Sequence, residues 1–137
     1  MANAPSSPGA ANLRWRAILT GAFLTVVFML SCDLLTRALG AVSIAPGLGA
    51  IAFFVAGFVA TRLLPGVRAL DPALGSAGAV LIVGLMQFTT LPELEPPVTA
   101  PQIALFVASV AAMAFLLSLL GARVGLVMQA RRRAPRA

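Results

Sequence analysis

Four long apolar segments, separated by short stretches rich in proline, glycine or charge, dominate the pattern of this chain. They cover about residues 15–39, 46–64, 72–91 and 101–122. Because a helix rises about 1.5 Å per residue, segments of this length cross all or most of a hydrocarbon core ~30 Å thick. The pattern predicts an all-α integral membrane protein: an antiparallel bundle of four transmembrane helices, with short loops that make consecutive helices neighbours.

Residues at the boundaries of these segments are typical of helix ends. Gly40 follows the first segment, where glycine often terminates a helix. Asp71, directly before a proline, is a favourable cap for the start of the third segment. Thr99 and Gln102 have the spacing of a capping box, in which each side chain satisfies the backbone N–H of the other residue. These signals indicate helices independently of hydropathy.

The positions of the arginines predict an orientation. Nine of the ten fall into three groups, at every second boundary between apolar segments. Basic residues in short loops stay on the cytoplasmic side of a membrane, so both termini are expected to be cytoplasmic. The connection at residues 92–101, by contrast, contains Glu93 and Glu95 and no basic residue. The three groups are Arg14 and Arg16; Arg62 and Arg68; and Arg123, Arg131, Arg132, Arg133 and Arg136.

Composition changes the picture in two ways. With 60% hydrophobic and 10% charged residues, the chain is far more apolar than soluble domains, which have about 45–50% and about 25%. Its 137 residues leave room for one domain only. We therefore expect a disordered cytoplasmic tail at residues 1–12, a single four-helix transmembrane domain at residues 13–130 and a basic cytoplasmic tail at residues 131–137.

The net charge of +6 does not indicate nucleic-acid binding. The charges lie beside apolar helix ends and lack interleaved aromatic residues or a recognition motif. Anionic lipid at the cytoplasmic face is the expected counter-charge, contacted by Arg131, Arg132 and Arg133. Arginine is used to the exclusion of lysine, and alanine, glycine and proline are abundant. This bias is typical of GC-rich bacterial genomes, and it predicts a multi-pass protein of a bacterial inner (plasma) membrane.

The residue types that the sequence lacks exclude most catalytic chemistry. Without histidine there is no His-ligated haem or zinc and no catalytic serine–histidine or cysteine–histidine pair. Without lysine there is no Schiff base. The single Cys32 cannot form an intrachain disulfide or hold an iron–sulfur cluster. We expect no metal, no cofactor and no enzymatic activity.

One polar constellation lies within the apolar segments. Asp33 is the only acid there, and a charge in hydrocarbon costs about 3 kcal/mol. Arg37 follows on the same helical face, at the spacing of an ion pair. One interpretation is a self-neutralised Asp33–Arg37 pair near the outer interface. The other is a polar cluster of Asp33, Arg37, Gln87 and Gln102 that binds a cation, relays a proton or docks a partner.

The first segment also resembles a bacterial lipoprotein signal peptide. Arg14 and Arg16, the apolar stretch and Cys32 correspond to its charged, apolar and cysteine parts. Met29 and Leu30 depart from the usual leucine followed by a small residue, and three more apolar segments follow. We therefore expect Cys32 to be a free, buried small residue.

Small residues at four-residue spacing recur in the apolar segments, and they let helices approach closely in lipid. Packing within the chain is the simpler interpretation. The alternative is that the last pair contacts another protein or a second copy. The candidate glycines are Gly21, Gly57, Gly121 and Gly125.

These features favour a non-catalytic membrane protein that acts through helix–helix association. It would be an accessory or assembly subunit, or a scaffold, with a membrane protein or a second copy as its partner. The alternative is a small oligomeric transporter or channel, coupled to ions or protons, that uses Asp33 with Arg37 and Gln87. Small four-helix multidrug transporters likewise carry one acid in the first helix.

Overall fold

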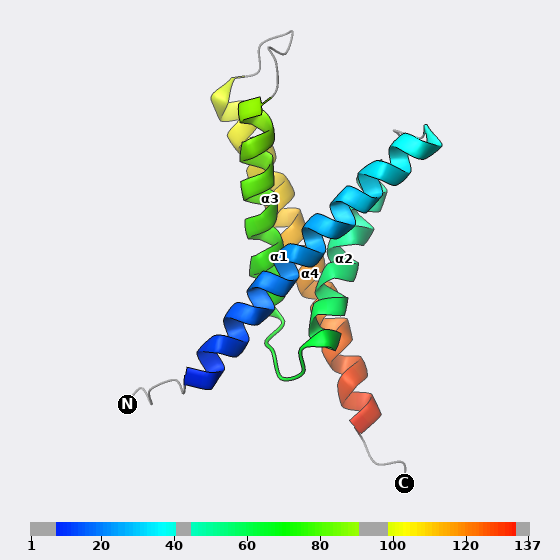
Figure 1. Ribbon diagram of the computed structural model, residues 1–137, viewed down its shortest axis with the longest axis vertical. Coiled ribbons are helices and arrows are strands. Elements are labelled where there is room, and N and C mark those ends of the chain that lie inside the picture. The colour runs from blue at the N-terminus through cyan, green and yellow to red at the C-terminus, as the bar shows by residue number, and fades with distance from the viewer. Residues whose placement is uncertain (1–7, 41–44, 91–98, 134–137) are drawn as a thin grey trace.

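The computed structural model describes residues 8–40, 45–90 and 99–133, and its regular elements are all helices (Figure 1). No strand occurs in these three ranges, which confirms the all-α prediction. Two of the helices contain stretches long and apolar enough to cross a membrane, Ala11–Leu39 and Ala100–Arg132. The described residues form the helices α1 (Pro8–Leu39), α2 (Ala45–Leu63), α3 (Leu70–Thr90) and α4 (Ala100–Arg133).

Local signals explain where α1 begins and ends. It starts at Pro8, within the tail that the sequence analysis assigned to disorder, because proline suits a first helical position and the following alanines favour helix. It ends at Gly40, as predicted. This glycine has a φ of 62°, and its N–H donates to the carbonyl of Arg37 at 3.3 Å. The predicted tail residues 1–7 and 134–137 lie outside the described residues.

The helices cross near the middle of the molecule and diverge toward both ends, as the X-shaped outline in Figure 1 shows. α1 packs against α2 and α3, and α4 packs against the same two helices. α2 and α3 also touch, whereas the backbones of α1 and α4 do not approach each other within the described ranges. The beginning of α1, the turn between α2 and α3 and the end of α4 all lie toward one end of the molecule (Figure 1).

Glycines sit where two helix backbones meet. Gly21 of α1 faces the backbone of Pro72 in α3, so tightly that an added Cβ would collide with it. On the other pair, Gly57 of α2 faces the carbonyl of Ser118 in α4, and Gly121 of α4 faces that of Phe54. All of these glycines are buried. The α1–α3 and α2–α4 crossings therefore depend on glycine, because a side chain at these positions would hold the two backbones apart.

The residues buried at these crossings are mostly small. Ala56, Ala73 and Ala114 are all 0% exposed, and a buried apolar cluster joins Phe53 and Val80 to two alanines. Most of the large apolar side chains lie on the outside instead. Trp15, Leu19, Phe23, Leu30, Leu34, Ile82, Met86, Leu105, Phe106 and Leu116 are among the exposed ones.

Candidate functional site

A chain of buried hydroxyl groups links three helices at the centre of the molecule. Thr25 of α1 donates a hydrogen bond to the Ser76 hydroxyl of α3 at 2.8 Å, and Ser76 lies 3.0 Å from the Ser118 hydroxyl of α4. All three residues are 0% exposed. Ser76 thereby connects α1 to α4, two helices whose backbones do not approach each other in the described ranges.

This hydroxyl chain holds helices together and offers little chemistry. Ser76 also lies 3.1 Å from the carbonyl oxygen of Pro72, so its single proton has two acceptors within reach. The hydroxyl of Thr61 in α2 is also buried, and it donates to the carbonyl of Phe58 in its own helix. The Thr61 carbonyl accepts from Gln129 of α4 at 2.7 Å. No base is hydrogen-bonded to any of these hydroxyls among the described residues, so they satisfy one another rather than activate a nucleophile.

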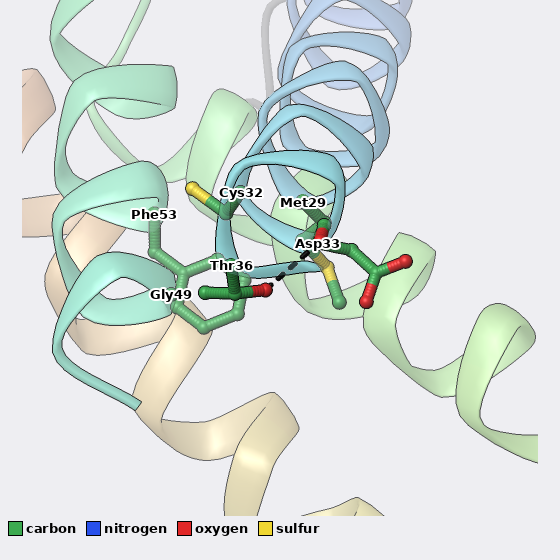
Figure 2. A pocket seen from close by; sticks show the side chains of 6 residues that line it. All are labelled: Met29, Cys32, Asp33, Thr36, Gly49 and Phe53. Carbon is green, nitrogen blue, oxygen red and sulfur yellow. Dashed lines mark hydrogen bonds between the residues drawn. The ribbon is translucent and has the colours of Figure 1, made fainter. Parts of the chain in front are cut away.

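The Asp33–Arg37 ion pair is present, on the outer surface of α1. Arg37 Nε lies 2.9 Å from Asp33 Oδ2, at the predicted one-turn spacing. Both side chains are exposed, that of Arg37 by 77% and that of Asp33 by 53%. In Figure 2 the Asp33 carboxylate points away from Phe53 and Gly49 of α2. The pair therefore faces the surroundings of the protein and not its interior.

A pocket of about 180 Å³ lies between α1 and α2 beside this ion pair (Figure 2). Its walls are mainly apolar, and the Thr36 hydroxyl is turned back onto the carbonyl of Asp33 at 2.9 Å. The Cys32 thiol lies 3.6 Å from the carbonyl of Leu48 in α2, half-buried as a free cysteine. No group of acids or cysteines suited to a metal ion occurs in the described part of the chain. The lining residues are Met29, Cys32, Asp33, Thr36, Gly49 and Phe53.

The wider polar cluster is not assembled in the described residues. The Gln102 side chain is held at its own helix start, where it accepts from the Thr99 N–H at 2.9 Å and from the Thr99 hydroxyl at 3.0 Å. Half of the predicted capping box is thus formed. The outer ends of α1 and α4 point to opposite sides in Figure 1, because the helices cross at their middles and then diverge. The side chain of Gln87 and the acids Glu93 and Glu95 lie outside the described residues.

The opposite end of the molecule contains an ion pair that sequence spacing did not reveal. Arg14 Nε of α1 lies 3.4 Å from Asp71 Oδ1 of α3. The Asp71 side chain is 2% exposed and that of Arg14 is 58% exposed. Oδ2 of Asp71 has no hydrogen-bond partner among the described residues. Asp71 and Arg14 are 57 positions apart in the chain, so local spacing predicts only a helix cap at Asp71 and not this pair.

Replacing Arg14 with alanine is expected to lower the free energy of unfolding by about 1 kcal/mol, since it leaves a buried carboxylate without its cation. The exposure of Arg14 keeps this effect below that of a fully buried pair. Arg16→Ala is the matched control, because Arg16 is exposed and has no ion pair within the described ranges. Equal unfolding midpoints for the two variants in detergent would contradict the role of the pair.

The remaining candidate residues divide into packing and surface positions. Gly21, Gly57, Gly121 and Gly125 all lie against a neighbouring helix of the same chain, Gly125 against Thr61. Arg131 and Arg132 are exposed at the end of α4, and the Arg133 side chain is not described. Comparisons of the chain with protein-family models, with characterised proteins and with solved structures found no match, so its function has to be inferred from these residues alone.

Proposed function

We propose that this chain is a multi-pass protein of a bacterial inner membrane, with four antiparallel helices that cross the bilayer. Two helices contain apolar stretches of 29 and 33 residues. α2 and α3, with 19 and 21 residues, extend over about 28–32 Å, close to the thickness of a hydrocarbon core. Small residues inside and large apolar residues outside are what lipid surroundings favour, since apolar surface there carries no cost.

The arginine groups support an orientation with both termini in the cytoplasm. Arg14 and Arg16 near the start of α1, Arg68 in the turn before α3 and the arginines at the end of α4 belong to segments that lie toward one end of the molecule (Figure 1). A single cytoplasmic face for these charges agrees with the positive-inside rule. Exposed Arg131 and Arg132 would then reach the headgroups of anionic lipids.

The proposed function is association: the chain acts as a non-catalytic accessory or assembly subunit, or as a scaffold, of a membrane complex. The observation that carries this proposal is the exposed Asp33–Arg37 ion pair. Charged side chains within transmembrane segments almost always face other protein or a water-filled cavity. A pair that faces outward on α1 therefore favours a protein neighbour at that position.

Transport through the bundle receives less support from the geometry. A proton or ion path through the chain would need Asp33 to line the interior, and this residue lies on the outside. Apart from Asp71, which pairs with Arg14, the buried polar side chains of the described residues are hydroxyls that already bond to one another or to backbone carbonyls. A protein neighbour beside α1 accounts for the exposed Asp33 without requiring a path for ions or protons through the chain.

Extraction of the tagged chain from its own membrane in mild detergent tests this function. We expect it to remain in the membrane pellet after carbonate washing and to purify with other membrane-protein chains, as judged by mass spectrometry after crosslinking. The same tag on an unrelated four-span protein is the control. A chain that is recovered free of any protein neighbour, in native membranes and at native abundance, would contradict the proposal.

The orientation has a separate test, in a Cys32→Ser background with one new cysteine at a time. We expect Glu95→Cys to react with a membrane-impermeant maleimide in intact spheroplasts, because the connection that contains it is predicted to lie outside. Arg132→Cys should react only after the membrane is opened. Labelling of both positions, or of Arg132→Cys alone, in intact spheroplasts would contradict this orientation.

A further inference from the structure

One face of α1 is left uncovered by the rest of the described chain along almost the whole helix. Large apolar side chains recur on it every four or seven residues, each between 60% and 68% exposed. Asp33 and Arg37 lie on the same face, because these intervals are close to whole turns of 3.6 residues. We call this surface the outer face of α1. Its apolar members are Trp15, Leu19, Phe23, Leu30 and Leu34.

The contacts of α1 explain why this face is free. Its opposite side is occupied by α3, which meets Gly21, and by α2, whose Leu48 carbonyl meets Cys32. α4 comes near α1 at Met29, which lines a pocket together with Phe106 and Val107 of α4 and does not belong to the outer face. The outer face is thus available to another molecule, and its charges determine which partner fits.

The charged part of the outer face falls within the outer leaflet under the proposed membrane placement, on which this inference rests. Asp33 lies ~27 Å along the helix from Trp15, and the inclination of α1 in Figure 1 shortens its distance along the molecule's long axis. Lipid tails offer no hydrogen-bond partner there. The intrahelical pair joins Nε of Arg37 to Asp33, and a guanidinium has five N–H donors in all.

We propose that the outer face of α1 binds the same face of a second copy, with Asp33 of each chain paired to Arg37 of the other. A two-fold axis along the membrane normal brings each patch against itself. Both copies then carry Asp33 and Arg37 at the same two levels, one helical turn apart. Along the membrane normal, each Asp33 is therefore as far from the partner's Arg37 as from its own Arg37. The result is a ring of two acids and two arginines in which each guanidinium bonds two carboxylates.

A second copy fits this face better than an unrelated chain does. The face carries one charge of each sign, so a partner needs the same two charges at the same spacing and in the same order along the membrane normal, with each acid one turn from the base of the other chain. A copy related by the two-fold axis provides both without further requirements. The apolar residues below the ion pair would extend the contact toward the cytoplasmic side.

Complementary charge variants test this pairing directly. Arg37→Asp gives a chain with two acids, and Asp33→Arg gives a chain with two arginines. Neither variant can form the ring with itself, but the two together can. We expect the differently tagged variants, co-expressed, to purify together roughly tenfold more than two differently tagged copies of either single variant.

This mixture separates pairing between chains from pairing within one helix, since both variants have lost their intrahelical pair. If the mixed variants associate no better than either variant alone, the ring is wrong. Wild-type chains that carry the two tags should also purify together, and the inference fails if they do not. Recovery of each variant from the membrane fraction confirms that the comparison concerns inserted protein.

Disulfide crosslinking provides a second test that leaves the charges unchanged. In a Cys32→Ser background, we expect Leu34→Cys to form covalent dimers in the membrane upon oxidation. Leu105→Cys, equally exposed but on α4, should remain monomeric. Crosslinking through Leu105→Cys alone would overturn the proposed face. A membrane-embedded monomer would overturn the dimer and leave the accessory function standing, whereas a chain absent from the membrane fraction would overturn both.

Discussion

Gly121→Ala is expected to destabilise the protein by about 2–3 kcal/mol, the upper part of the range for overpacking a tight contact. The new Cβ would collide with the carbonyl oxygen of Phe54, a backbone atom that cannot turn aside as a side chain would. α2 and α4 must then move apart along their crossing, and the contacts of Gly57 and Gly125 are weakened with it. The unfolding midpoint in a detergent titration measures this loss.

Gly78→Ala is the matched control for this prediction. It makes the same substitution inside a helix, but a Cβ at Gly78 meets no described atom within 4 Å. Alanine is intrinsically better than glycine in a helix by about 1 kcal/mol, so this variant should be neutral or slightly more stable. Equal effects of Gly121→Ala and Gly78→Ala would show that helix propensity, and not the α2–α4 crossing, determines the outcome.

Ser76→Ala is expected to cost about 1–2 kcal/mol, because it removes the only hydroxyl that joins Thr25 of α1 to Ser118 of α4. Both partner hydroxyls are fully buried, so no solvent replaces the lost bond. Hydrogen bonds between membrane helices average about 0.6 kcal/mol, and the prediction is larger because two such contacts meet at one residue.

Ser109→Ala is the control for the hydroxyl chain. Its hydroxyl bonds only to the Leu105 carbonyl of its own helix, at 2.8 Å, and lies exposed. We expect a change below about 0.5 kcal/mol. Double-mutant cycles that combine Ser76→Ala with Thr25→Val and with Ser118→Ala should show coupling in both pairs. Additive effects in both cycles would mean that the hydroxyls are neighbours without a shared network.

Features that depend on neighbours along the chain could be predicted from the sequence. The end of α1 at Gly40 follows from the ease with which glycine adopts a positive φ. The Asp33–Arg37 contact and the bond from Gln102 to the Thr99 N–H follow from the spacing of residues on one helical turn. Each involves residues no more than four positions apart, so helix geometry alone places them together.

Features that depend on how helices cross could not be predicted in the same way. Thr25, Ser76 and Ser118 each fitted a small residue in an apolar run, and only the crossing of α1, α3 and α4 brings their hydroxyls into contact. Asp71 fitted a helix cap, yet it lies within the first turn of α3, which begins at Leu70, and meets Arg14 from another helix. The polar cluster predicted from the sequence placed Gln102 near Asp33, but α1 and α4 diverge toward the ends that carry these residues.

The sequence by itself determined the helices, their apolar character and the groups of arginine that favour one orientation. Hydropathy, helix-end chemistry and charge act locally or upon insertion, and they need no knowledge of which helix meets which. The tertiary structure alone decided that α1 packs on α3 and α2 on α4, and that Asp33 and Arg37 face outward. Which helices pack together depends on how well their surfaces fit. Many small residues in the sequence would permit close approach, and only the folded structure shows which glycines lie against a carbonyl of another helix.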